Sequence, residues 1–143
     1  MNTQEKLRRI DFRLKTDVEV LSNTAKYDGY TPVYIALRGS QNYEMDNEDS
    51  DIDTLVVVCP PFTELLWNSA PVSDVIELTD GSHIEVKDIK HFKDLLLRSN
   101  TSMLETLFTP YFDIPTENKA VEESMKILRR RAEKIAQYDP KRL

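Results

Sequence analysis

The chain has 143 residues, of which 40% are hydrophobic, so it is long enough for one domain with a core and too short for two. Its formal net charge of −6, from 25 acidic and 19 basic residues, excludes a positive field over the whole protein, and we expect no extended DNA binding. No apolar run reaches the roughly 20 residues of a membrane span, and the one cysteine, Cys59, allows no disulfide within the chain. We therefore expect a single domain, residues 1–143, that is cytoplasmic and makes no contact with a membrane.

The first half of the chain predicts one helix followed by two strands. From Thr3 to about Ala25, apolar side chains recur every three or four residues and form one stripe: Leu7, Ile10, Leu14, Val18, Leu21 and Ala25. Val33 to Leu37 is a short apolar run typical of a buried strand, and Gly39-Ser40 follows its end. After a polar segment, residues 51–58 predict a second strand whose distal half is β-branched and buried.

The second half predicts a hairpin between helices. Asp80-Gly81 supplies the hairpin turn, and Asp88 is the expected N-cap of the helix that follows. The expected elements in chain order are a short helix over 62–67, strands over 75–78 and 83–86, a helix from 89 to about 96, a short helix over 103–108, and a last helix over 117–137. This order predicts a mixed α/β (α+β) class in which helices flank one small mixed β-sheet.

Three acidic residues form the candidate catalytic and metal-binding site. Asp51 and Asp53 are two apart at the start of a strand, so their side chains share a face, with Cα atoms about 6.6 Å apart. Glu85 lies between apolar Ile84 and Val86 and therefore faces the other way, where a neighbouring strand would bring it to the same place. Carboxylates this close repel each other unless a cation joins them, and hard oxygen ligands favour Mg²⁺ or Mn²⁺. We therefore expect a pair of divalent ions.

A phosphate-binding turn is expected beside these carboxylates. Gly39-Ser40 stands where a buried strand turns into a short helix, which places backbone N–H groups and a hydroxyl where phosphate groups bind. Lys87 shares a face with Glu85 and is a further candidate for nucleotide binding. A triphosphate held there would present its α-phosphorus for in-line attack, so the predicted reaction class is nucleotidyl transfer.

These residues lie in three segments: Leu37-Arg38-Gly39-Ser40-Gln41-Asn42-Tyr43, Ser50-Asp51-Ile52-Asp53-Thr54 and His83-Ile84-Glu85-Val86-Lys87-Asp88-Ile89. Together they resemble the nucleotidyltransferase superfamily of DNA polymerase β, over about Val33 to Phe112, and above all its uncharacterised bacterial and phage-type members. The resemblance implies that Asp51 and Asp53 bind two divalent ions and that Gly39-Ser40 holds the β- and γ-phosphates of an NTP. It also implies that Glu85 completes the site and helps to activate an acceptor hydroxyl.

Two functional hypotheses follow from the sequence. The first is an enzyme that transfers a nucleoside monophosphate from an NTP to a hydroxyl acceptor, which is a protein, an RNA or a small molecule. The second is a catalytically silent nucleotide-binding or regulatory module of the same fold, indicated by Glu44, which stands where such proteins often have glycine. Because longer relatives continue past a segment like 133–139, we expect the helical C-terminal segment, about 113–143, to be truncated relative to them.

Several polar groups have a plainer interpretation. For Asp51 and Asp53 the alternative is a solvated acidic loop, and for Glu85 it is the exposed face of a hairpin strand. Arg38 is expected to shape its turn without taking part in chemistry. The histidines are too far apart in the pattern to form a metal pair. The basic residues of the last helix are expected to form a solvated face: Lys126, Arg129, Arg130, Arg131 and Lys134.

Overall fold

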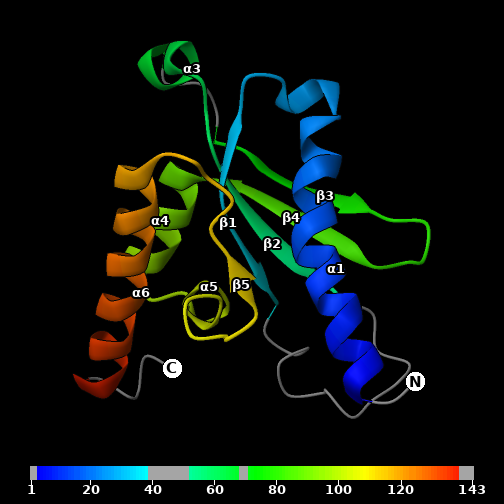
Figure 1. The fold of residues 1–143 in the computed structure, drawn as a ribbon. Coiled ribbons are helices and arrows are strands. Elements are labelled where there is room, and N and C mark those ends of the chain that lie inside the picture. The colour runs from blue at the N-terminus through cyan, green and yellow to red at the C-terminus, as the bar shows by residue number, and fades with distance from the viewer. Residues whose placement is uncertain (1–2, 39–51, 68–70, 139–143) are drawn as a thin grey trace.

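The computed structural model describes residues 3–38, 52–67 and 71–138 and is built on a five-stranded sheet in the order β3-β4-β2-β1-β5 (Figure 1). The strands are β1 (Thr31–Leu37), β2 (Thr54–Cys59), β3 (Ser73–Glu77), β4 (His83–Asp88) and β5 (Phe112–Asp113). The helices are α1 (Thr3–Ser22), α3 (Phe62–Trp67), α4 (Ile89–Leu97), α5 (Thr101–Glu105) and α6 (Lys119–Tyr138). Within these described ranges, none of the helices combines the length and apolar character needed to cross a membrane.

The sheet is mixed, because one of its four strand pairs is parallel. β1 pairs antiparallel with both β2 and β5, and β3 pairs antiparallel with β4 across a hairpin. β2 and β4 run parallel, with Thr54 opposite Ile84 and Leu55 opposite Glu85. A parallel pair needs a long connection, and here the segment from α3 through β3 provides it. The parallel strands β2 and β4 therefore begin at the same end of the sheet.

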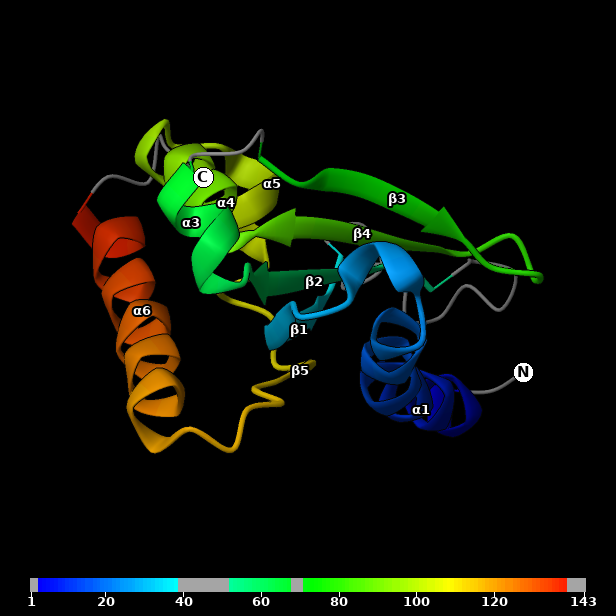
Figure 2. The ribbon, with the colours of Figure 1, turned by 90° about the horizontal axis from the view of Figure 1, so that it is seen from above.

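Helices cover both faces of the sheet (Figure 2), and each face has its own hydrophobic core. α1 packs on one face through residues such as Ile10 and Leu14, and α4, α5 and α6 pack on the other through residues such as Phe92 and Met103. Along β2 the side chains alternate between these cores: Val56 and Val58 belong to the α1 face, and Leu55 and Val57 to the opposite one. This two-sided burial accounts for the continuous apolar run that marked β2 in the sequence.

The expected fold is confirmed, a mixed α+β architecture with a small sheet flanked by helices. The helix over 62–67 and the hairpin are present, and Gly81 occupies the hairpin turn with φ of 89°. Asp88 caps α4 as expected, since its Oδ1 accepts the His91 N–H at 2.7 Å. Its Oδ2 accepts the Val72 N–H at 2.7 Å and so also fixes the chain at the entry to β3.

Several boundaries differ from the expected ones. β1 starts at Thr31 and includes Pro32, which is tolerated because the register shifts at a bulge there. β2 begins at Thr54, so Asp53 precedes the strand, while Asp51 lies outside the described residues. α5 lies over 101–105 instead of 103–108, because the Asn100 side chain accepts the Met103 N–H and starts the helix early.

The helical C-terminal segment begins at Lys119, not near residue 113. Phe112–Asp113 is strand β5, which pairs with Ala36 and Ile35 of β1. Two residues carry too little alternation to be recognised as a strand in a sequence, and only the pairing partner defines this one. Similarly, α1 ends at Ser22 and a separate 3-10 turn, Ala25–Tyr27, follows it.

The same substitution at a core and an edge position tests the assigned core. Val56→Ala removes two methyl groups from a fully buried site in β2 and is expected to lower the free energy of unfolding by about 2 kcal/mol. Val75→Ala, at a position 63% exposed on β3, is expected to change it by less than about 0.5 kcal/mol. Urea denaturation measures both, and equal losses would contradict this placement of the core.

Candidate active site

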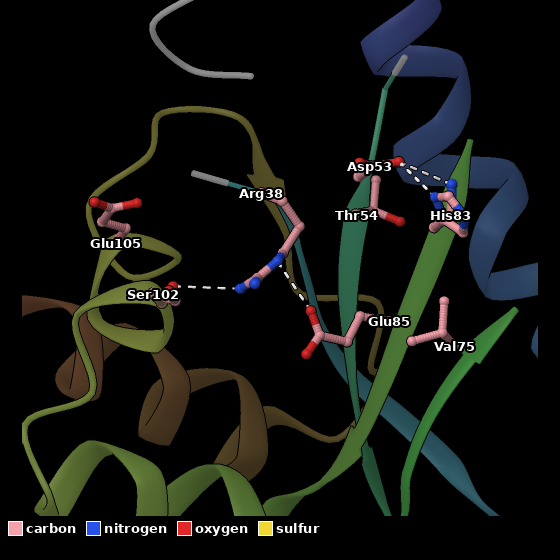
Figure 3. A pocket seen from close by; sticks show the side chains of 8 residues that line it. All are labelled: Arg38, Asp53, Thr54, Val75, His83, Glu85, Ser102 and Glu105. Atoms are coloured by element: carbon pink, nitrogen blue, oxygen red, sulfur yellow. Dashed lines mark hydrogen bonds and ion pairs between the residues drawn. The ribbon is translucent and has the colours of Figure 1, made fainter. Parts of the chain in front are cut away.

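A cavity of about 570 Å³ opens where β1 ends and β2 and β4 begin (Figure 3). Its walls come from three strands and from α5, which faces the sheet across the opening. Eight residues line it: Arg38, Asp53, Thr54, Val75, His83, Glu85, Ser102 and Glu105. The cavity therefore brings together side chains up to 67 positions apart in the sequence, from Arg38 to Glu105.

Asp53 is fixed at the entrance to β2 by contacts on both its side chain and its backbone. Its Oδ1 accepts the backbone N–H of His83 at 2.8 Å, and the His83 Nδ1 lies 3.5 Å from the same oxygen. Its backbone carbonyl accepts the N–H of Arg38 at 2.9 Å. Asp53 thus joins the end of β1 to the start of β4, and its side chain keeps 36% of its surface exposed.

Glu85 reaches the same cavity from β4. Ile84 and Val86 belong to the core beneath α1, so Glu85 projects from the opposite face, as the alternation predicts. Because Glu85 stands opposite Leu55, two positions after Asp53, the Cα atoms of the two acidic residues are about 8 Å apart diagonally across the parallel pair. The pairing of adjacent strands therefore places two carboxylates on one cavity.

Glu85 is held by a cation on each of its carboxylate oxygens. The Arg38 Nε lies 3.0 Å from Oε2, and the Lys87 Nζ lies 3.2 Å from Oε1 (Figure 3 shows the first contact). Lys87 is only 7% exposed, and its Nζ also donates to the Ser73 Oγ at 2.8 Å. Lys87 is buried beside Glu85 and is not one of the residues that line the cavity. Its contact with a nucleotide therefore stays a prediction.

Arg38 crosses the cavity and is the main residue that the sequence interpretation missed. Besides its ion pair with Glu85, its Nη1 donates to the Ser102 carbonyl on α5 at 3.3 Å. From the sequence, Arg38 was expected only to shape a turn. Its position directly after a buried strand was nevertheless a signal, because a charged side chain there lies where the strand leaves the sheet. His83 and the α5 residues Ser102 and Glu105 were also missed, because only the fold brings them to the carboxylates.

Three predicted residues lie outside the part of the chain that the structure describes. They are Gly39, Ser40 and Asp51. Their neighbours on either side are described: Arg38 and Ile52 belong to the two chain segments that border the cavity. Their roles as phosphate-binding and metal-binding residues stay predictions.

The oxygen donors on the cavity suit a hard divalent cation in part. Among the described residues, no group of three or more His, Cys, Asp or Glu side chains is close enough to hold a metal ion. Asp53 presents a carboxylate oriented by a backbone N–H, which is the usual state of a metal-ligating carboxylate. Glu85 fits only after it releases Arg38 or Lys87, because both of its oxygens carry a cation.

Two of the described basic residues of α6, Arg129 and Lys126, make different kinds of contact. Arg129 donates to the Tyr34 hydroxyl at 2.6 Å and to the Thr109 carbonyl at 2.8 Å, and it stacks on Phe112 with its guanidinium 3.5 Å from the ring centroid. It therefore anchors α6 to β1 and β5. Lys126 pairs with Glu122 along the helix, as expected of a solvated face.

A comparison with known protein families found one family whose model is similar to this chain over residues 14–138, described as RlaP: RNA repair pathway DNA polymerase beta family. The matched region contains Arg38, Asp53, Glu85 and the other residues that line the cavity. None of the curated proteins matches the chain.

A double-mutant cycle tests whether Glu85 and Lys87 depend on each other. Glu85→Gln leaves the Lys87 ammonium buried without its counter-charge, so we expect a loss of about 1–2 kcal/mol in unfolding free energy. Adding Lys87→Met should cost less in the variant than in the wild type, with a coupling on the order of 1 kcal/mol in urea denaturation.

The control for this cycle is a more exposed pair on α6, Glu122 and Lys126, changed to Glu122→Gln and Lys126→Met, whose Nζ–Oε1 distance is a similar 3.1 Å. This pair is expected to show no measurable coupling, because water screens it. Equal coupling in the two cycles would mean that Glu85 and Lys87 behave as an ordinary surface pair.

Proposed function

The chain belongs to the RlaP family, an RNA repair pathway DNA polymerase beta family, and from this premise we propose that it transfers a nucleoside monophosphate from an NTP to a hydroxyl group. In this reaction the acceptor oxygen bonds to the α-phosphorus of the NTP, the bond from that phosphorus to the bridging oxygen breaks, and pyrophosphate leaves with the electron pair. The acceptor hydroxyl gives up its proton. Membership in a DNA polymerase β-type family makes the chain a nucleotidyltransferase by class.

The observation that carries the proposal is the shared cavity of Asp53 and Glu85. Two acidic residues from adjacent parallel strands meet there, and Arg38 and Lys87 supply positive charge beside them. Under the proposal, Asp53 acts with Asp51 as a ligand of Mg²⁺ or Mn²⁺. Two such ions, when bound, supply positive charge that offsets the charge on the attacking and leaving oxygens.

The other residues have roles in binding and proton transfer. Glu85 accepts the proton of the acceptor hydroxyl or completes the metal site, and for the second role it exchanges one of its cations. Arg38, once released from Glu85, is a guanidinium at the edge of the cavity and suits a phosphate oxygen. Gly39-Ser40, which directly follows Arg38 in the chain, is proposed to hold the β- and γ-phosphates.

The family description supports RNA as the acceptor, since it places the family in an RNA repair pathway. A net charge of −6 argues against strong binding of a long duplex through its phosphates, but it is compatible with binding of one RNA end at a local site. We therefore propose a hydroxyl at an RNA end as the acceptor, ahead of a protein or a small molecule.

Transfer of an α-labelled NTP tests the reaction and the site together. With Mg²⁺ or Mn²⁺, the wild type is expected to transfer label to RNA, and Asp53→Asn and Glu85→Gln are expected to lower the rate by at least roughly 100-fold each. The reason is that each substitution removes a negative charge from the cavity without changing the size of the side chain. The rate is measured at saturating NTP with all variants shown to be folded.

Asp74→Asn is the matched control, because Asp74 is a carboxylate on β3 that does not line the cavity. Hydrogen bonds from Lys26 and, to a smaller extent, Tyr27 hold the pKa of Asp74 below its ordinary value, so Asp74 is ionised at neutral pH. Its variant should keep the wild-type rate. Equal losses in all three variants would contradict the assignment, and NTP binding without transfer by the wild type would favour the silent module.

The choice of acceptor is tested with paired oligonucleotides. A single-stranded RNA that ends in a free 3′-hydroxyl should be extended by label, and the same RNA closed by a 3′-phosphate should lose that product if the 3′-hydroxyl is the acceptor. Product length on a denaturing gel measures the outcome. Label transfer to protein in preference to either RNA would overturn RNA as the acceptor without affecting the reaction class.

A further inference from the structure

We propose that Arg13 and Asp17 of α1 are positioning residues, which hold the segment around Asp53 in place from the face of the sheet opposite the cavity. The inference rests on the proposed function of that cavity and assigns a role to two residues outside it. Arg13 also lies one position before the region that matches the family. Neither residue was a candidate in the sequence, where both fall on a helix without any active-site motif.

Arg13 contacts three residues in two separate segments of the site scaffold. Its Nη1 donates to the Ile52 carbonyl at 2.5 Å and to the Ser82 Oγ at 2.8 Å. Its Nη2 donates to the His83 carbonyl at 3.2 Å. One guanidinium therefore ties α1 to the residue before Asp53 and to the start of β4.

Asp17 completes the arrangement one helical turn further on. Its two carboxylate oxygens accept from the Arg13 Nε at 2.8 and 3.0 Å, which fixes the direction of the guanidinium. Its Oδ2 also accepts the Thr54 hydroxyl at 2.6 Å. Ile52 and Thr54, the two neighbours of Asp53, are thus both held from α1.

These contacts act on the Asp53 carboxylate through its neighbours Ile52, Thr54 and His83. The Ile52 side chain belongs to the core beneath α1, and the Thr54 hydroxyl donates to Asp17 of α1. Because successive residues of an extended chain point to opposite faces, the Asp53 side chain between them is directed at the cavity. His83 is held in the same way: its carbonyl accepts from Arg13, and its N–H donates to Asp53. The positions of the carboxylate and of its hydrogen-bond donor are therefore set by the same arginine.

The cost of this pair argues that it does more than stabilise the fold. Arg13 is 7% and Asp17 1% exposed, and placing two charges in an interior carries a desolvation penalty that apolar residues of similar size avoid. The pair lies in the α1 face of the sheet, where the neighbouring positions Ile10, Leu14 and Leu21 are apolar. Arg13 and Asp17 contact Ile52, Thr54 and His83, so they lie at the level of α1 where β2 and β4 begin.

Two conservative substitutions test the proposal. Thr54→Val keeps the side-chain shape and removes the hydroxyl that Asp17 accepts, and Arg13→Lys keeps the charge and removes the planar array of donors. Tyr34→Phe is the matched control, because it removes a buried hydroxyl that donates to the Thr106 carbonyl at 2.6 Å in the other core.

The first readout is the His83 backbone amide, which reports on the Asp53 carboxylate by ¹⁵N NMR without any ligand. In Arg13→Lys and Thr54→Val, we expect this resonance to move and its exchange with solvent to become faster, while Tyr34→Phe leaves it unchanged. The second readout is Mn²⁺ affinity by electron paramagnetic resonance. It is expected to fall about 10-fold in Arg13→Lys and less in Thr54→Val, with wild-type affinity in Tyr34→Phe.

The third readout separates positioning from substrate binding. The kcat for label transfer should fall about 10-fold or more in Arg13→Lys while the KM for NTP stays near the wild-type value. If the His83 amide in both variants matches that of Tyr34→Phe, with only the melting temperature lowered, the pair is structural and the proposal is overturned. If the wild type transfers no nucleotide, the proposed function fails, and a His83 amide changed only in Arg13→Lys and Thr54→Val still supports the positioning role.

Discussion

The parallel pairing of β2 with β4 is the constraint on which the rest of the site depends. Two parallel strands begin at one edge of the sheet, so the residues at their starts are neighbours although about 30 positions separate Asp53 from His83 and Glu85. Sliding the register by one residue would turn Glu85 into the core beneath α1 and bring an apolar side chain to the cavity. The alternation of buried and half-buried residues at the start of β4 therefore fixes the register of the strand pair and, with it, the position of Glu85 on the cavity.

Three carboxylates at or behind the cavity, those of Glu85, Asp53 and Asp17, each have a positively charged or N–H donor beside them, and these donors come from different elements. Arg38 at the end of β1 and Lys87 on β4 hold Glu85, and the backbone N–H of His83 holds Asp53. Behind the sheet, Arg13 holds Asp17. A site assembled in this way keeps acidic groups close together before any metal binds, because the repulsion between them is offset locally. Under the proposed function, binding of a divalent ion at Glu85 is an exchange of one cation for another.

The sequence was sufficient for the features that depend on local pattern. The apolar stripes of α1 and α6, the hairpin around Gly81 and the Asp88 cap follow from periodicity and turn chemistry. The opposite orientations of Glu85 and its neighbours follow from alternation. These are properties of a few consecutive residues, and neighbours far away in the chain do not alter them.

The features that were missed depend on partners distant in the sequence. β5 exists only because β1 pairs with it, and the roles of Arg38 and Arg13 appear only when the carboxylates and carbonyls they contact are in place. A crystal structure with Mn²⁺ and a non-hydrolysable NTP analogue tests the account most directly, through anomalous scattering of the metal. The account predicts Mn²⁺ bound to the Asp53 carboxylate in the cavity, with the triphosphate beside it. Mn²⁺ and nucleotide bound elsewhere, with Asp53 contacting neither, would contradict it.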